Sequence, residues 1–120
     1  MAYAQAFVAQ EPARAEVEAM RGDVVLEFGA PWCGHCIAAA PLAEQALGAR
    51  EARHLRIEDG RGRPLGRSFR VKLWPTFVLL RDGHERARVV RPRSMREIEA
   101  MFDDASPGDD ASPGDDAYPG

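Results

Sequence analysis

The fold of this chain is decided by the segment Val24-Val25-Leu26-Glu27-Phe28-Gly29-Ala30-Pro31-Trp32-Cys33-Gly34-His35-Cys36. Four β-forming residues stand at positions 24–28, which is typical of a buried central strand. Small and aliphatic residues follow Cys33 and predict a helix from about residue 33 to residue 49, kinked at Pro41. The only two cysteines of the 120-residue chain therefore lie where a strand passes into a helix.

The spacing of these cysteines indicates redox chemistry. Two positions separate Cys33 from Cys36, so their sulfurs can close a small ring. Cys33 opens the predicted helix, where unsatisfied backbone N–H groups and the helix dipole stabilise a thiolate and favour a nucleophilic sulfur. Cys36 lies one turn further in and is the expected resolving thiol, which forms the Cys33–Cys36 disulfide.

Periodicity and turn residues outline the remaining elements. An edge strand is predicted from Tyr3 to Val8, a short helix over residues 12–21, and a strand over residues 54–58. A second short helix is predicted over residues 64–70, and two strands over residues 77–80 and 85–90, joined by an Asp82-Gly83 turn. A last helix follows Ser94 and ends near Phe102, so the order favours a mixed sheet between helices.

Two stretches resemble a known family. The sequence Ala-Pro-Trp-Cys-Gly-His-Cys at residues 30–36 is similar to the active site of the thioredoxin superfamily in its protein disulfide isomerase form. The stretch WPTFVLLRDG at residues 74–83 resembles the cis-proline strand of that family and the turn after it. The resemblance spans about residues 23–102. It implies an α/β thioredoxin-like fold with a mixed sheet of four to five strands, and a thiol–disulfide oxidoreductase that acts as a protein-disulfide reductase.

The resemblance also assigns a role to Glu27. This residue lies six positions before Cys33, where the family keeps a buried acid. A buried carboxylate there is expected to accept the proton of Cys36 through a water molecule. The alternative is an outward-facing strand charge, which the otherwise apolar run around Glu27 disfavours.

A client groove is expected beside the sulfurs. The resemblance implies that Pro75 is cis and faces the cysteines, although cis bonds are only about 5–6% of X-Pro bonds in folded proteins. The backbone of Trp74 would then be left to pair with an extended client segment. Trp32, Gly34 and Trp74 complete the expected substrate-binding set, with core packing as the alternative role of Trp74.

Three positions depart from the family pattern. Gly29 stands where the family usually has a large aromatic residue, and Trp74 replaces a small or branched aliphatic one. Arg91-Pro92 occupies the place where a glycine normally lets the client approach. We expect these departures to change the groove more than the sulfur chemistry.

His35, between the two cysteines, is expected to tune the redox potential. A cation beside the Cys33 thiolate stabilises the reduced form and makes the disulfide a stronger oxidant. Thioredoxin and protein disulfide isomerase have potentials of about −270 and −180 mV, and this chain is expected to fall between them. The alternative is that His35 is only an exposed spacer. We expect His54 and His84 to be ordinary strand and turn residues.

Composition bounds the location and partners. The chain has 45% hydrophobic and 29% charged residues, which suits one domain with an adequate core. Because neither a signal peptide nor a membrane span is recognised, a cytoplasmic monomer without metal or cofactor is expected. Its expected partners are client proteins with disulfides and an electron donor of the thioredoxin-reductase type. Nucleic-acid binding is not expected, because no aromatic interleaving or basic helix accompanies the basic residues.

Charge is distributed unevenly along the chain. Between Arg50 and Arg96 there are 14 basic residues and five acidic ones, which either steer acidic partners or form an ordinary solvated surface. From Asp103 onward the hexads DDASPG, DDASPG and DDAYPG follow one another. We therefore predict a domain over residues 1–102 and a disordered acidic tail over residues 103–120. The tail either aids solubility or competes with acidic clients.

Other functions remain open at this stage. A disulfide oxidase or isomerase would use the same two cysteines, and His35 favours it while the lack of a signal peptide disfavours it. A redox-inert binding adaptor would use the groove and the basic surface alone. Cys33 and Cys36 supply only half of a tetrahedral zinc site, so zinc would need a second chain.

Overall fold

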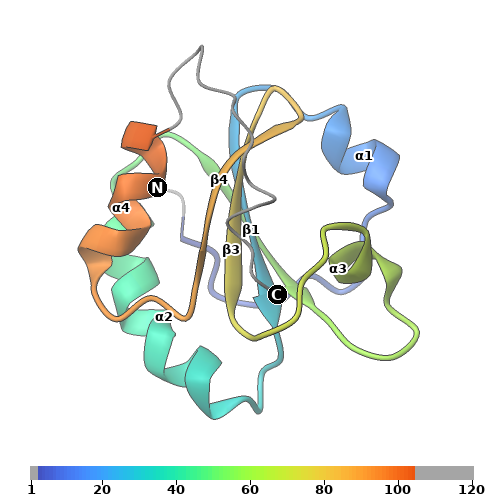
Figure 1. Ribbon diagram of the computed structural model, residues 1–120, viewed down its shortest axis with the longest axis horizontal. Helices are drawn as coiled ribbons and strands as arrows, with labels where there is room; N and C mark the ends of the chain where they lie inside the picture. Colours follow the sequence, from blue (N-terminus) through green and yellow to red (C-terminus); the bar gives the residue numbers. More distant parts are fainter. Residues whose placement is uncertain (1–2, 105–120) are drawn as a thin grey trace.

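A four-stranded mixed sheet forms the middle of the computed structural model, which describes residues 3–104 (Figure 1). The strands are β1 (Asp23–Gly29), β2 (Arg53–Glu58), β3 (Thr76–Arg81) and β4 (His84–Val90), in the order β2-β1-β3-β4. β1 pairs in parallel with β2 and antiparallel with β3, and β3 pairs antiparallel with β4. The expected mixed α/β sheet is confirmed, with four strands.

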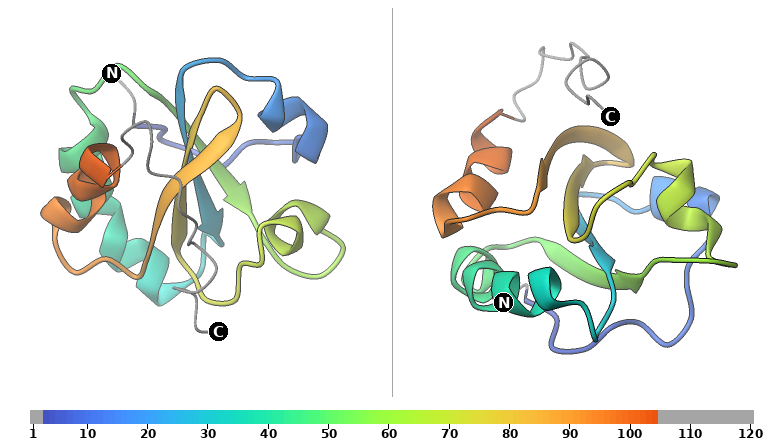
Figure 2. Two further views of the ribbon diagram at one scale, coloured as in Figure 1. Left: turned by 45° about the horizontal axis from the view of Figure 1, so that its top comes forward. Right: turned by 60° about the horizontal axis from the view of Figure 1, so that its bottom comes forward.

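Helices cover both faces of this sheet. They are α1 (Arg14–Glu18), α2 (Gly34–Leu47), α3 (Pro64–Ser68) and α4 (Met95–Asp104). α2 and α4 lie side by side on one face, whereas α1 and α3 lie on the other (Figures 1 and 2). No helix within residues 3–104 is long and apolar enough to cross a membrane.

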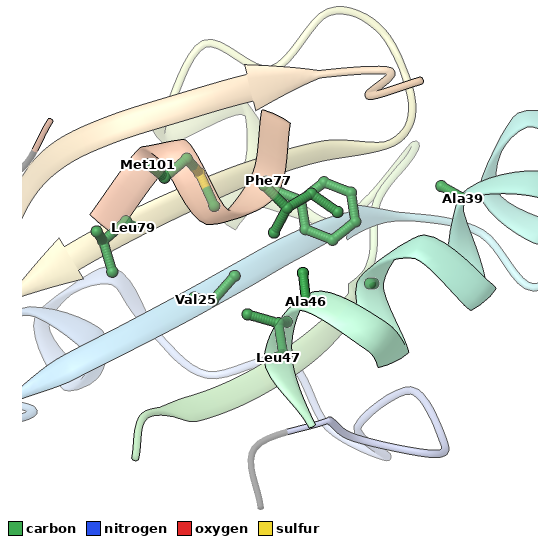
Figure 3. Close-up of a cluster of buried hydrophobic side chains, with 9 residues drawn as sticks. Val25, Ala39, Ala46, Leu47, Phe77, Leu79 and Met101 are labelled. Carbon is green, nitrogen blue, oxygen red and sulfur yellow. The ribbon is translucent and has the colours of Figure 1, made fainter. Parts of the chain in front are cut away.

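β1 is the central strand because every residue from Val24 to Gly29 is buried. Side chains alternate between the two faces of a strand, so β1 contributes to both cores. Val25 packs in the core under α2 and α4, which is drawn in Figure 3 with Phe77 and Leu79 of β3. Val24, Leu26 and Phe28 pack in the core under α1 and α3. Glu27 therefore shares the α2 face with Val25.

The connection from β1 to α2 closely follows the expectation. Cys33 is the N-cap of α2, with extended backbone angles, and the helix begins at Gly34. α2 continues through Pro41, which is exposed, and ends at Leu47, two residues before the predicted end. The switch from strand to helix thus places both cysteines at the carboxyl end of β1.

The N-terminal part departs from the expectation. Tyr3 to Val8 does not form an edge strand; only an isolated bridge joins Phe7 to Arg56, beside a Val8 N–H bond to the Arg56 carbonyl. The backbone N–H of Ala4 donates instead to a side chain, Nδ1 of His54, so it cannot take part in a ladder. α1 is also shorter than predicted, beginning at Arg14 and ending at Glu18 with Ala19 as its C-cap.

The C-terminal half contains the predicted hairpin. Asp82 and Gly83 both have positive φ, 51° and 84°, as a two-residue type I′ turn requires. α4 extends to Asp104, two residues beyond the predicted domain boundary. The rest of the predicted tail, residues 105–120, lies outside the described residues.

Candidate active site

Cys33 and Cys36 are free thiols at the N-terminus of α2. The Cys33 Sγ accepts a hydrogen bond from the backbone N–H of Cys36 at 3.3 Å. Cys33 is 8% exposed and Cys36 is 1% exposed, so Cys33 is the outer sulfur, although it too is largely covered. This is the arrangement expected from the sequence, with one accessible thiol and one inner thiol a turn further on.

The inner thiol is held in its neutral form. Burial raises the pKa of Cys36 to about 12, with smaller contributions from the hydrogen bond to Cys33 and the charge of Glu27. Its sulfur packs on the end of β1, because a Cβ at Gly29 would lie 2.5 Å from the Cys36 Sγ. A side chain at position 29 would therefore require the Cys36 sulfur to move. Cys36 needs a base before it can attack.

The cis bond expected at Pro75 is confirmed, between Trp74 and Pro75. Trp74 packs against the cluster formed by Ala30, Cys33 and Cys36, so its aromatic ring covers the sulfurs. The departures at Gly29 and Trp74 are thus connected. The aromatic side chain that is missing at the end of β1 is supplied by the residue before the cis proline.

Trp74 is fixed by two further contacts. Its indole N–H donates to Oδ2 of Asp59 at 2.9 Å. Its ring meets Trp32 edge to face, with centroids 5.6 Å apart and planes at 71°. Trp74 thus packs on the cluster of the two cysteines and also contacts Trp32 beside them, and its role in client binding stays a prediction. Asp59 was not recognised in the sequence, since its partner lies 15 residues away.

Arg91 corrects the expectation that the Trp74 backbone is left for a client. The Arg91 Nε donates to the carbonyl oxygen of Trp74 at 2.7 Å, and the Arg91 backbone N–H donates to the carbonyl of Pro75 at 2.9 Å. Arg91 has φ +50°, a conformation that glycine adopts more easily. The guanidinium therefore occupies the main-chain acceptor that an extended client would use.

Glu27 is completely buried, which rules out the outward-facing alternative. One of its oxygens, Oε1, lies 2.9 Å from the Nε2 of His54 and 3.3 Å from the Nε of Arg56. The other oxygen, Oε2, makes no hydrogen bond to the described residues. The carboxylate is thus held at one oxygen and open at the other.

His54 and Arg56 are the site residues that the sequence interpretation missed. Both are buried, on β2, and the parallel register places Arg56 opposite Glu27 and His54 opposite Val25. The signal was the alternation within residues 54–58. Leu55 and Ile57 pack in the core under α1 and α3, so His54 and Arg56 must face α2 together with Glu27.

An open cavity of about 430 Å³ reaches the inner thiol from the surface. Its walls come from the N-terminal segment, the loop before Cys33, the first turn of α2 and β2. The lining residues are Gln5, Ala6, Phe7, Ala30, Pro31, Cys36, Ile37 and Arg56. Cys36 is therefore covered by Trp74 on one side and bordered by this cavity on another.

The exposed apolar surface gathers at the same place. Trp32, Ile37 and Leu73 are the large hydrophobic side chains exposed within residues 3–104, at 70%, 59% and 50%. Each is next in sequence to Cys33, Cys36 or Trp74. We call these three side chains the apolar rim. Gly34 and His35 are exposed in the first turn of α2, in the same stretch.

Known proteins share this site and fold. The thioredoxin family model matches residues 5–104. The reduced form of thioredoxin 2 from Pseudomonas aeruginosa PAO1 superposes with a TM-score of 0.73 at 54% identity, covering 81% of this chain and 91% of that one. "Thioredoxin Asp f 28" of Aspergillus fumigatus is 33% identical over 86 residues, which are 71% of this chain and 80% of that protein.

A plant relative gives a similar match. "Thioredoxin H-type 1" of Nicotiana tabacum is 32% identical over 85 residues, which are 70% of this chain and 68% of that protein. The family match spans β1, the paired cysteines at its carboxyl end and the cis proline that faces them. The chain therefore belongs to the thioredoxin family of thiol–disulfide oxidoreductases.

Proposed function

We propose that this protein reduces disulfides of client proteins through Cys33 and Cys36. The observation that carries the proposal is the position of Cys33, whose sulfur caps α2 next to the apolar rim while Cys36 lies directly behind it. A helix N-terminus stabilises the thiolate that disulfide exchange requires. The apolar rim offers a surface for the polypeptide around a client disulfide.

The reaction has two steps. The Cys33 thiolate attacks one client sulfur, the client disulfide breaks, and the other client sulfur leaves with the bonding electrons and takes a proton from solvent. Cys36 then attacks Cys33 in the mixed disulfide, the bond from Cys33 to the client breaks, and the client leaves as a second thiol. The client gains two electrons, and the protein is left with a Cys33–Cys36 disulfide.

Glu27 is the proposed proton acceptor in the second step. A thiol with a pKa of about 12 is almost entirely protonated at neutral pH, so Cys36 needs a base to attack at a useful rate. Glu27 lies close enough for its charge to act on Cys36, and its Oε2 has no hydrogen-bond partner among the described residues. A water molecule between the two groups would carry the proton.

The direction of electron flow depends on the redox potential. We propose net reduction, with electrons supplied by a thioredoxin-reductase-type enzyme in a reducing compartment such as the cytoplasm. His35 acts against this direction, because its cationic form stabilises the reduced pair. A disulfide oxidase or isomerase is the second candidate, and His35 is the observation that favours it.

Turnover of insulin disulfides with dithiothreitol tests the proposal. The wild-type protein should accelerate insulin reduction, whereas Cys33→Ser should abolish the acceleration because it removes the nucleophile. A redox-inert adaptor would give the same slow rate for the wild-type and variant proteins. His84→Ala, which changes an exposed histidine at the start of β4, serves as the surface control.

Equilibration with glutathione tests the direction. A wild-type potential near −270 mV supports the reductase, and one near −180 mV supports the oxidase or isomerase. His35→Ala should make the potential more negative by about 30 mV, because losing the cation destabilises the thiolate. An unchanged potential would show that His35 is only a spacer.

A further inference from the structure

We propose that His54 is a positioning residue for the resolving step. In its neutral form, with the proton on Nε2, it anchors Oε1 of Glu27 and leaves Oε2 to receive the proton of Cys36. This inference rests on the proposed function, because it concerns the second step of disulfide exchange. It adds a residue of β2 and the N-terminal segment, residues 3–7, to the machinery that deprotonates the inner thiol.

The hydrogen bonds on the two ring nitrogens define the tautomer. The backbone N–H of Ala4 donates to the Nδ1 of His54 at 2.8 Å. A backbone amide is only a donor here, so Nδ1 must be the acceptor and carries no proton. The proton of the neutral ring is then on Nε2, which donates to the Oε1 of Glu27 at 2.9 Å. Protonating Nδ1 would break the bond to Ala4.

The two cationic or donor groups around Glu27 act on the same oxygen. The Arg56 Nε also approaches Oε1, at 3.3 Å, as an ion pair without a hydrogen bond, so His54 is the hydrogen-bond donor to that atom among the described residues. Arg56 is itself held by the hydroxyl of Tyr3 at 3.2 Å and by the ring of Phe7, 4.6 Å from the guanidinium carbon. The contacts of both groups on Oε1 leave Oε2 as the carboxylate oxygen without a hydrogen-bond partner among the described residues.

The N-terminal segment both holds these donors and borders the route to the thiol. Tyr3 and Ala4 bond to Arg56 and His54, while residues 5–7 line the open cavity that reaches Cys36 and Arg56. Water in this cavity can therefore meet the inner thiol beside the Glu27 pair. In this proposal, the N-terminal segment, which the sequence predicted as an edge strand, fixes the two residues that hold the Glu27 carboxylate.

In the resolving step, Cys36 transfers its proton to Oε2 of Glu27 through water. The Cys36 thiolate then forms a bond to Cys33 as the client thiolate leaves.

Other titratable or charged groups face the Glu27–His54 pair from the surrounding elements within residues 3–104. They are Arg56 on β2, Tyr3 in the N-terminal segment and Cys36 on α2.

A single-turnover reaction with 5,5′-dithiobis(2-nitrobenzoate) separates the two steps. Attack by Cys33 releases one coloured thiolate, and attack by Cys36 on the mixed disulfide releases a second. His54→Leu removes the donor to Glu27, His54→Gln keeps an amide donor, and His84→Leu is the matched control on β4. All four proteins should show the same rate for the first release.

The rate of the second release should depend on the residue at position 54 and should not depend on the residue at position 84. In His54→Leu it should be about tenfold slower at pH 7, because the carboxylate loses the hydrogen bond that orients it toward the inner thiol. His54→Gln should restore most of the rate, and His84→Leu should match the wild type. An unchanged second release in His54→Leu would overturn the proposal.

Nitrogen-15 NMR of the wild-type protein provides a measurement without substitution. The proposal requires an unprotonated Nδ1 and a protonated Nε2 at pH 7. A proton on Nδ1, or on both nitrogens, would overturn it even if His54→Leu failed to fold. If the wild type released no second thiolate, the proposed function itself would fail, which is a different result from a slow release in His54→Leu alone.

Discussion

The effect of burial on chemistry is clearest at Cys36, whose thiol pKa it raises. Its thiol is 1% exposed, lies against the backbone of Gly29 and has a pKa raised to about 12. The same burial that protects the sulfur from side reactions makes it a poor nucleophile. The residues around it cover the sulfur, and in the proposed mechanism Glu27 takes its proton.

The raised pKa of Cys36 predicts a pH dependence of stability. The folded thiol ionises near pH 12 and the unfolded thiol near its ordinary value of 9.0, so the unfolded state loses its proton first. Stability is lost as the pH rises between these values, by at most about 1.4 kcal/mol per pH unit. Urea unfolding of the reduced wild type and of Cys36→Ala should diverge above pH 9. Parallel pH dependences would contradict the shift.

Arg91 is predicted to hinder extended clients. Arg91→Gly removes the guanidinium from the Trp74 carbonyl and suits the φ of +50°. We expect reduction of an unstructured peptide disulfide to become about fivefold faster, the worth of one regained hydrogen bond. Arg21→Ala changes an exposed arginine at the opposite end of β1 and should have no effect. A slower reaction in Arg91→Gly would show that the guanidinium binds the client.

At this scale, local motifs were predictable and long-range partners were not. The roles expected for Cys33, Cys36 and Pro75 rested on short contiguous patterns, and the structure places all three at one site. The partners of Glu27 and Trp74 depend on which strands are neighbours and in what register. Strand register is set by tertiary packing, so the alternation at residues 54–58 could place His54 on one face of its strand but could not give its partner, nor that of Arg91.

Among the elements, the β3–β4 hairpin has a turn whose residues are fixed by both backbone conformation and contacts to α1. Asp82 and Gly83 form its turn, and the Asp82 side chain accepts a hydrogen bond from the backbone N–H of Gly22 at 2.8 Å. The carbonyl oxygen of Glu18 lies directly against Gly83. The turn therefore joins the hairpin to the end of α1 as well as reversing the chain.

Gly83→Ala should destabilise the protein by about 2 kcal/mol. The added Cβ would collide with the Glu18 backbone, and the φ of +84° disfavours alanine. The matched control is Gly34→Ala, because Gly34 begins α2 with no atom near the new Cβ, so its stability should be unchanged or higher. Thermal unfolding measures both. Equal melting temperatures for the two variants would show that the turn tolerates a side chain.

Elements with strong periodicity were predictable, and those held by side chains were not. β1, α2 and the hairpin follow from buried runs and turn residues, and their ends differ from expectation by at most two residues. The N-terminal segment has β-forming residues but is held by His54 and Arg56 instead of a ladder. The backbone N–H of Ala4 bonds to the His54 side chain, which no local propensity anticipates.

At the level of the whole molecule, several basic residues make contacts within the domain that stabilise the fold. Arg81 pairs with Asp23 at 2.7 Å, Arg88 with Glu85 at 2.6 Å, and the guanidinium of Arg50 stacks on Phe102 at 4.0 Å. The surplus of arginine between positions 50 and 96 is thus partly neutralised within the domain. We propose that the remaining charges and the acidic C-terminal repeats together set any electrostatic preference for acidic clients.

Removal of residues 105–120 should accelerate the reduction of an acidic client at low salt. The deletion takes away Asp109, Asp110, Asp115 and Asp116, so the remaining chain is less repulsive to negative charge. We expect an increase of about two- to threefold at 20 mM salt that disappears at about 500 mM, where such fields are screened. Replacing the same four aspartates by asparagine is the control for length. No change in salt dependence would exclude a role of the tail in client selection.

Trapping of the mixed disulfide shows which cysteine attacks first. If Cys33 attacks and only Cys36 completes the exchange, Cys36→Ser incubated with a peptide disulfide should accumulate one covalently bound peptide. Intact-mass analysis and peptide mapping should place that peptide on Cys33, and dithiothreitol should release it. Cys33→Ser should remain unmodified under the same conditions. A peptide found on Cys36 instead, or equal labelling of both variants, would contradict the assigned order of attack.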